Sequence, residues 1–215
     1  MSRATTLREP PSTIWNKLAL TVAFLVGVGF VAGFVLPYFQ LTEAALGRYS
    51  AKRAWLLLHI STGTVALLLG PFVLGLGLNR RRMQLHRAIG MAYIVSIALS
   101  AAAAFYLAFN TDLSWVFGMG LTGLAIAWIV TTSLAFVAIK KRLIPQHKEW
   151  MIRSYVVTLA FVNFRILVGI LQAAGIGTVI EQIEAASWFC WAFPLLVTEA
   201  VLQGKKIVNP REATR

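Results

Sequence analysis

The amino-acid sequence predicts an all-α integral membrane protein, a bundle of about six transmembrane helices. Of its 215 residues, 58% are hydrophobic and 13% are charged, whereas soluble domains are roughly 45–50% apolar and about 25% charged. The apolar residues form long uninterrupted blocks rather than the three-and-four spacing of an amphipathic surface helix. The charged residues gather in the short segments between those blocks. A lipid bilayer is therefore the solvent that these helices require.

Six apolar blocks are each close to the length, about 20 residues, that a helix needs to cross a bilayer core of roughly 30 Å. The blocks cover residues 18–39, 55–78, 88–109, 113–139, 151–174 and 186–202. We expect Pro194 to kink the last and shortest block. Because six spans fill most of the chain, the sequence predicts one transmembrane domain over residues 14–204, with tails at 1–13 and 205–215.

The distribution of lysine and arginine predicts the orientation of the bundle, because these residues are retained on the cytoplasmic side of a membrane. They are abundant in the amino-terminal tail, in the second and fourth connections and after the last block: Arg3, Arg8, Lys17, Arg80, Arg81, Arg82, Arg87, Lys140, Lys141, Arg142, Lys148, Lys205, Lys206, Arg211 and Arg215. The other connections hold only Arg48, Lys52 and Arg53. We therefore expect an inner-membrane protein with both termini in the cytoplasm.

Composition and motifs also exclude several classes of function. The formal net charge is +12, but the basic residues lie beside apolar blocks, so we expect anionic lipid headgroups as partners and no nucleic acid. Cys190 is the only cysteine, which excludes an intrachain disulfide and a cysteine zinc site. Gly118, Gly120 and Gly123 form a GxGxxG pattern inside an apolar block, without the strand that a dinucleotide loop requires. No nucleophile elbow, P-loop or HExxH motif is present, and the sequence does not decide whether the protein is an enzyme.

Histidines are the first candidates for a functional site, because polar side chains are costly inside a membrane. His86 and His147 lie at the cytoplasmic entrances of the third and fifth spans, at similar depth on two helices. Two imidazoles on facing helices are able to bind haem iron or a transition metal. Solvated interface residues are the competing interpretation, which the neighbouring Arg82, Arg87 and Lys148 favour.

Helical spacing places further polar residues in line with these two histidines. Steps of three and four join His86 to Gly90, Tyr93, Ile97 and Ser100, and join His147 to Met151, Ser154, Thr158 and Arg165. Two polar stripes are therefore able to face each other, and Tyr93, Ser154 and the adjacent Tyr155 are candidates for supporting polar residues of the histidine site. The competing interpretation is ordinary packing, in which small residues and hydroxyls let helices approach closely.

A second candidate polar site lies toward the other side of the membrane. Arg165 brings a permanent charge into the fifth span, at a cost of about 2.5–3.5 kcal/mol near a helix centre. His59 lies at a similar depth in the second span, and Glu199 is too close to the cytoplasmic end of the sixth span to pair with Arg165. A bound carboxylate, propionate or lipid phosphate would fill that role, unless the side chain extends outward to the headgroups. On the cytoplasmic side, Arg87 and Arg153 are candidates for contacts with anions or headgroups.

Two stretches, LHRAIGMAY over residues 85–93 and HKEWMIRSY over residues 147–155, resemble motifs of domain-of-unknown-function family 2306, a group of bacterial multi-pass membrane proteins. The family forms are H-R-x-x-G-x-x-Y and H-x-x-W-M-x-R-S-Y, with a further arginine in the same helix. The matching residues are His86, Arg87, Gly90, Tyr93, His147, Trp150, Met151, Arg153, Ser154, Tyr155 and Arg165. The resemblance extends from about His59 to Arg165, and it implies a bacterial inner membrane but no activity.

Two hypotheses of function follow. In the first, which the sequence favours, the protein is a non-enzymatic component that binds or transports lipids or small molecules, or assists assembly with a partner membrane protein or a second copy of itself. In the second, His86 and His147 hold haem b or a transition metal in a membrane redox module, where arginines meet propionates or quinone oxygens. That module resembles transmembrane di-haem cytochromes, which use two histidine pairs, whereas three histidines permit one pair at most.

Overall fold

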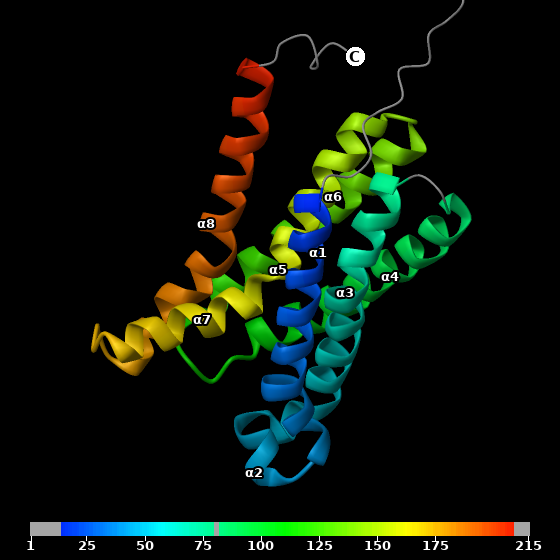
Figure 1. Ribbon diagram of the computed structural model, residues 1–215. Helices are drawn as coiled ribbons and strands as arrows, with labels where there is room; N and C mark the ends of the chain where they lie inside the picture. The colour runs from blue at the N-terminus through cyan, green and yellow to red at the C-terminus, as the bar shows by residue number, and fades with distance from the viewer. Residues whose placement is uncertain (1–13, 80–81, 209–215) are drawn as a thin grey trace, which may run out of the picture.

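The computed structural model describes residues 14–79 and 82–208, and every regular element within these ranges is a helix (Figure 1). The helices are α1 (Ile14–Phe30), the π-helix η1 (Val31–Val35), the 3₁₀ helix η2 (Leu36–Gln40), α2 (Glu43–Leu46), the 3₁₀ helix η3 (Gly47–Lys52), α3 (Arg53–Asn79), α4 (Met83–Phe109), α5 (Trp115–Lys140), α6 (Ile144–Thr158), α7 (Ala160–Ala173) and α8 (Val179–Val208). The predicted all-α class is therefore confirmed.

Five helical segments are long and apolar enough to cross a membrane, and the bent pair of α6 and α7 makes a sixth if it counts as one span. This confirms the prediction of about six transmembrane helices. The prediction of one unbroken fifth span over residues 151–174 is wrong. The pair is bent by 44° around Leu159. The Thr158 hydroxyl donates to the Ser154 carbonyl at 2.9 Å, and such a bond one turn back along the chain favours bending of a helix.

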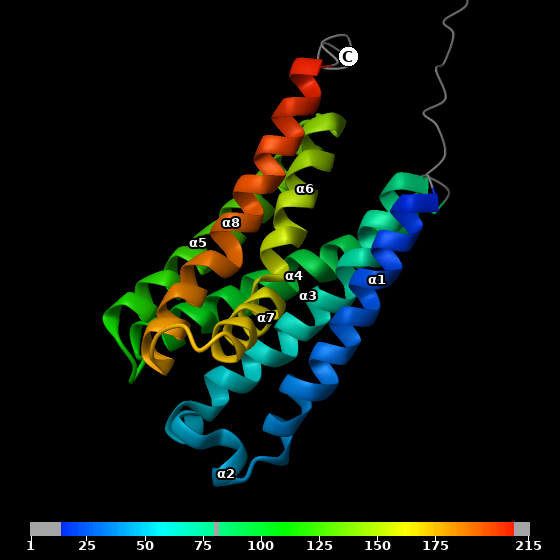
Figure 2. The same ribbon diagram turned by 60° about the vertical axis from the view of Figure 1, so that its left-hand side comes forward.

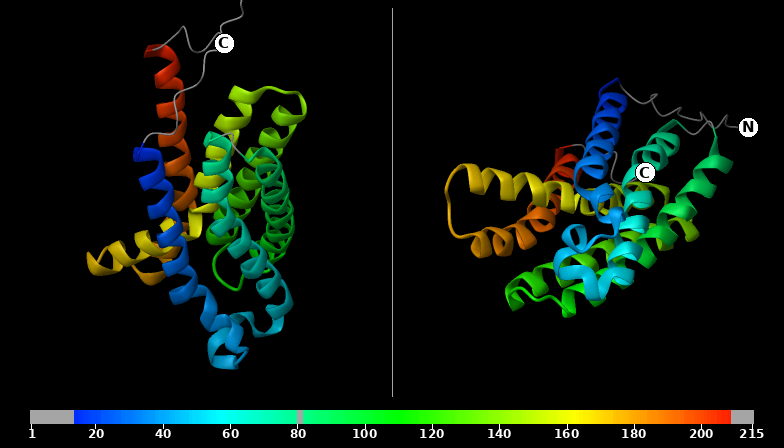
Figure 3. Two further views of the ribbon diagram at one scale, coloured as in Figure 1. Left: turned by 45° about the vertical axis from the view of Figure 1, so that its right-hand side comes forward. Right: turned by 90° about the horizontal axis from the view of Figure 1, so that it is seen from below.

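Helices α3, α4, α5 and α6 form a four-helix bundle in which each helix packs against the next and α6 packs back against α3 (Figures 1 and 2). Helices α4 and α6 are therefore diagonal partners across the centre of the bundle. Helix α1 lies along α3, and α8 packs against α5, α6 and α7. Helix α7 runs away from the long axis of the bundle, as the view from below shows most clearly (Figure 3).

The two ends of the bundle differ in charge. The start of α1, the end of α3, the start of α4, the α5–α6 connection and the end of α8 lie at one end, which we call the basic end (Figure 1). Its described basic residues are Lys17, Arg82, Arg87, Lys140, Lys141, Arg142, Lys148, Lys205 and Lys206. The opposite end holds η2, α2, η3 and the α4–α5 and α7–α8 connections. The described basic residues thus concentrate at one end of the bundle, as the alternation of basic-rich and basic-poor connections along the chain predicts. Which end faces the cytoplasm stays a prediction.

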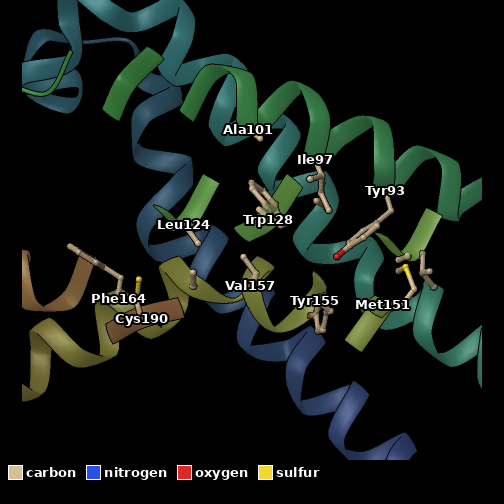
Figure 4. Close-up of a cluster of buried hydrophobic side chains, with 14 of the residues drawn as sticks. Tyr93, Ile97, Ala101, Leu124, Trp128, Met151, Tyr155, Val157, Phe164 and Cys190 are labelled. Carbon is tan, nitrogen blue, oxygen red and sulfur yellow. The ribbon is translucent and has the colours of Figure 1, made fainter. Parts of the chain in front are cut away.

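The core of the bundle is a buried cluster of large apolar side chains (Figure 4). Tyr93 and Ile97 of α4 are 0% and 1% exposed, and Trp128 of α5 lies in the same cluster. The GxGxxG glycines lie within α5 and serve helix packing. A Cβ on Gly120 would overlap Ser187 of α8. The GxGxxG pattern is therefore part of a helix that packs closely against α8 rather than a loop that follows a strand.

Tyr155 connects α6 to α3. Its ring lies against Gly70, where a Cβ would overlap the aromatic carbons. Pro71, inside α3, has no N–H and so leaves the Leu67 carbonyl without its usual helical donor. The Tyr155 hydroxyl donates to that carbonyl at 3.4 Å. Tyr155, which the sequence suggested as a supporting residue of the histidine site, therefore stabilises a helix contact beside that site.

Candidate functional site

Two histidines meet across the centre of the four-helix bundle, near the basic end. His86 is the fourth residue of α4, and His147 is the fourth residue of α6. Their ring centroids are 6.4 Å apart, and the ring planes are inclined at 85°. The pair lies between α4 and α6 at the basic end of the bundle, where both side chains are half-buried. The structure thus brings together the two residues that the sequence proposed as ligands.

Both rings are oriented by a hydrogen bond at Nδ1. His86 Nδ1 lies 3.1 Å from the Val73 carbonyl of α3, and His147 Nδ1 lies 2.8 Å from the Ala135 carbonyl of α5. A carbonyl oxygen only accepts, so each Nδ1 carries the proton and donates it. Each Nε2 keeps its lone pair, and neither has a hydrogen-bond partner within residues 14–79 and 82–208. The pair therefore presents two nitrogen atoms that are able to act as metal ligands.

A hydrogen bond to the backbone of the preceding helix positions each histidine, in two successive helical hairpins, α3–α4 and α5–α6. In each hairpin the histidine of the second helix donates to a carbonyl of the first, 13 residues earlier for His86 and 12 residues earlier for His147. A hydroxyl residue, Tyr93 or Ser154, follows seven positions after each histidine. Sequence reasoning missed this repeat, although the equal spacing of histidine and hydroxyl was a signal for it.

A buried network of hydroxyl groups lies about 10 Å from the histidines along α4 and α6, toward the middle of the bundle. The Tyr93 hydroxyl lies 2.9 Å from both Ser154 Oγ and Thr158 Oγ1. Thr132 Oγ1 lies 2.8 Å from Ser154 Oγ, and Trp128 Nε1 donates to Thr158 Oγ1 at 2.9 Å. The network satisfies polar groups in an apolar core and ties α4, α5 and α6 together. It therefore supports the geometry of the histidine pair without touching it.

The two predicted cytoplasmic arginines have different surroundings. Arg87 is exposed at the basic end. Arg153 is only 5% exposed, and its Nε donates to the Glu199 carboxylate of α8 at 2.7 Å. Its guanidinium also lies over the Trp150 ring, 4.6 Å from the centroid, and 3.5 Å from Glu149. The Arg153 side chain thus lies against α8 and pairs with Glu199, while a contact with an anion or headgroup stays a prediction. Sequence reasoning missed this partner, because it did not place α8 beside α6.

His59 and Arg165 line one cavity, of about 180 Å³, toward the opposite end of the bundle. His59 Nδ1 lies 3.0 Å from the Ser100 carbonyl, and the Ser100 hydroxyl donates to the His59 carbonyl at 3.0 Å. The Arg165 guanidinium lies over the Phe34 ring, 5.1 Å from its centroid. No ion pair to Arg165 occurs among the described residues. We call this space the His59–Arg165 cavity.

A bundle of apolar helices with a half-buried histidine pair at one end defines a multi-pass membrane protein that has a candidate ligand site near its basic end. The chain belongs to the family described as predicted membrane protein (DUF2306), whose model matches residues 56–202. This confirms the resemblance that the two histidine motifs indicated. No curated protein and no solved structure matches the chain. Since the family description gives a location and no activity, the function has to be argued from the site.

Proposed function

We propose that the protein binds one metal centre between His86 and His147, either haem b iron or a transition-metal ion, as a membrane redox module. The orientation of the two rings supports this proposal most directly. Both Nδ1–H groups bind backbone carbonyls, and both Nε2 atoms keep their lone pairs. Histidines that bind metals are arranged in this way, because the hydrogen bond fixes the ring and increases the basicity of the ligand nitrogen.

The separation of the rings fits one ion between them. A bond from a metal to imidazole nitrogen is about 2 Å long and the ring centre lies about 1 Å behind that nitrogen, so imidazoles on opposite sides of an ion have centroids about 6 Å apart. The observed separation of 6.4 Å is close to this value. The orientation of the two rings and the distance between their centroids are separate observations, and both favour one metal ion between the two Nε2 atoms.

The number of protein ligands favours some metals over others. The described part of the chain has no cluster of three or more histidine, cysteine or carboxylate side chains, so a tetrahedral zinc site made by protein alone does not fit. Haem iron fits this number of protein ligands, because the porphyrin would supply the others and His86 and His147 would hold the iron. A copper ion fits as well, since imidazole is a common copper ligand. A bound haem or copper ion would supply one-electron chemistry.

The basic end suits an anionic group close to the pair. Arg87 follows His86 directly and is exposed, and the described residues of the basic end include further arginines and lysines. Such cations bind haem propionates or the headgroups of anionic lipids. The predicted role of Arg87 as an anion contact is therefore part of the proposal, as is a cytoplasmic location for this end.

The competing hypothesis is a non-enzymatic component that binds lipids, small molecules or a partner membrane protein. It assigns no ligand to the histidine pair and treats the two rings as a T-shaped packing contact, for which 6.4 Å is an ordinary separation, but it gives no reason for the matched hydrogen bonds at Nδ1. The sequence favours this hypothesis, whereas the geometry favours the metal centre. The two hypotheses differ in one direct observable, the haem and metal content of the purified protein.

The test is to purify the full chain in detergent from cells supplied with haem precursor, iron and copper, and to record its absorption spectrum and elemental composition. We expect a Soret band or bound copper in the protein, and a loss of at least about tenfold in His86→Ala and His147→Ala. Gln146→Ala, which changes an exposed residue next to His147, is the matched control and should keep the wild-type content. A folded wild-type protein without haem or stoichiometric metal would contradict the proposal.

A further inference from the structure

The His59–Arg165 cavity has the size of a ligand site. Its volume is about 180 Å³, whereas an engineered apolar cavity of about 150 Å³ holds benzene. The cavity therefore has room for one substituted ring but not for a whole phospholipid. Aromatic side chains form much of its wall, among them Phe117, Trp128 and Phe161. This wall favours a flat, apolar ligand over an acyl chain.

Two irregular helix segments meet at this cavity. The π-helix η1 contributes Phe34 and Val35, and the break between α6 and α7 contributes Thr158 and Ala160. Irregular backbone at membrane depth is tolerated where it is buried in protein or lines a cavity, and π-helical turns are frequent at functional sites. Both departures from regular helix therefore fall where a ligand site would need them.

The wall of the cavity carries the polar side chains of His59 and Arg165, together with hydroxyl groups of tyrosines and threonines: Tyr38, Tyr49, Thr64, Thr111 and Thr158. His59 Nδ1 lies 3.0 Å from the Ser100 carbonyl, which only accepts, and 2.9 Å from the Ser100 hydroxyl, whose own proton goes to the His59 carbonyl. Nδ1 therefore carries the proton of the His59 ring, and Nε2 is an acceptor with no partner among the described residues. Arg165 offers hydrogen-bond donors and has no carboxylate partner in the same part of the chain. The two are related through Phe161, whose ring centroid lies 6.0 Å from that of His59 and which precedes Arg165 by one helical turn. A matching ligand has a donor at one edge and an acceptor oxygen at another.

We propose that the His59–Arg165 cavity binds the ring of a lipid-soluble hydroquinone or quinone. In the hydroquinone, one ring hydroxyl donates to His59 Nε2 and the other oxygen accepts from the Arg165 guanidinium. The quinone keeps the bond to Arg165 but has no donor for His59. A fatty acid would use Arg165 alone and leave the His59 acceptor unpaired. This site lies at the other end of the bundle from His86 and His147 and does not depend on the metal centre.

The test is to measure dissociation constants by isothermal titration calorimetry, with the full chain in detergent and without oxygen. The probes are decyl-hydroquinone with dithionite, decyl-benzoquinone without reductant, decanoate and decylbenzene. We expect the hydroquinone to bind about tenfold more tightly than the quinone. His59→Ala should weaken hydroquinone binding about tenfold and remove the preference, and Arg165→Gln should weaken both ring compounds by a similar factor.

Arg48→Gln is the matched control, because Arg48 is an exposed cation of the same end that does not line the cavity. It should leave every dissociation constant unchanged. Ala104→Phe narrows the cavity while keeping His59 and Arg165, so it should abolish binding even if a polar variant does not fold. The inference is wrong if neither ring compound binds saturably, if decanoate or decylbenzene binds as tightly as the hydroquinone, or if the folded variants bind it like the wild type. Haem and metal content, measured separately, decides the proposal for His86 and His147.

Discussion

The hydroxyls of Tyr93 and Ser154 lie 2.9 Å apart in the bundle core, and each residue follows a histidine of the proposed metal site by seven positions. Both side chains are fully buried, at 0% exposure. Their hydrogen bond joins α4 and α6 across the bundle diagonal and so fixes the relative height of the two helices. His86 and His147 are held at the same level because of this register.

Removing the Tyr93 hydroxyl tests that relationship. Tyr93→Phe leaves Ser154 and Thr158 without one partner each, and we expect it to lower the free energy of unfolding by about 1–3 kcal/mol. The measurement is reversible unfolding in mixed micelles, followed by circular dichroism. Tyr106→Phe, a change at an exposed tyrosine of the same helix, should have little effect. Equal stabilities of the two variants would show that the network does not hold the helices together.

The contact between Gly70 and Tyr155 predicts a second effect on stability. A Cβ at position 70 would overlap the Tyr155 ring, so Gly70→Ala should cost about 1–3 kcal/mol through overpacking. Gly75→Ala is the control in the same helix, since its Cβ would lie 3.5 Å from Leu20, an ordinary contact. The measurement is the midpoint of thermal unfolding in detergent. The packing argument fails if Gly70→Ala unfolds at or above the wild-type temperature.

The ion pair of Arg153 and Glu199 predicts a non-additive pair of mutations. Loss of one partner of a buried pair costs about 3–5 kcal/mol, and the 44% exposure of the Glu199 side chain reduces this, so we expect Glu199→Gln to cost about 1–3 kcal/mol. Arg153→Leu should cost more, because the arginine is the buried partner. The double variant should be more stable than the sum of the single losses predicts, as a double-mutant cycle of unfolding free energies would show. Additive losses would mean that the two side chains do not interact.

The predicted orientation of the bundle is open to a labelling test. Cys190 is 2% exposed and should not react, so a single new cysteine reports on its own position. We expect Ala51→Cys, at the opposite end, to react with an impermeant maleimide in intact spheroplasts. Gln84→Cys, at the basic end, should react only after the membrane is opened. The reverse pattern would place the basic end outside.

Much of the fold follows from composition and from the length of the apolar blocks, because blocks of bilayer length have few structures open to them. The break around Leu159 does not, since it depends on a side-chain bond from Thr158 to the backbone within an apolar run. The sequence also did not predict the short helices η2, α2 and η3, because each is too short to leave a clear pattern of hydropathy. Local hydrogen bonds rather than hydropathy decide both features.

The candidate site was predictable in its residues but not in its contacts. Depth along two helices is enough to pair His86 with His147, since both stand at the entrances of their spans. The partners at Nδ1 are backbone carbonyls of Val73 and Ala135, and no side-chain pattern indicates them. The pairing of Arg153 with Glu199 was missed as well, because the neighbour of α6 depends on how the last helix packs.

The most direct test of the metal centre is the amount of haem and metal per chain in the purified protein, determined by pyridine haemochrome assay and mass spectrometry of the elements. The proposal predicts about one haem or one copper ion per wild-type chain and less than about one tenth of that in the double variant His86→Ala/His147→Ala. A wild-type chain with no haem and no metal, or a double variant with the wild-type amount, would contradict it.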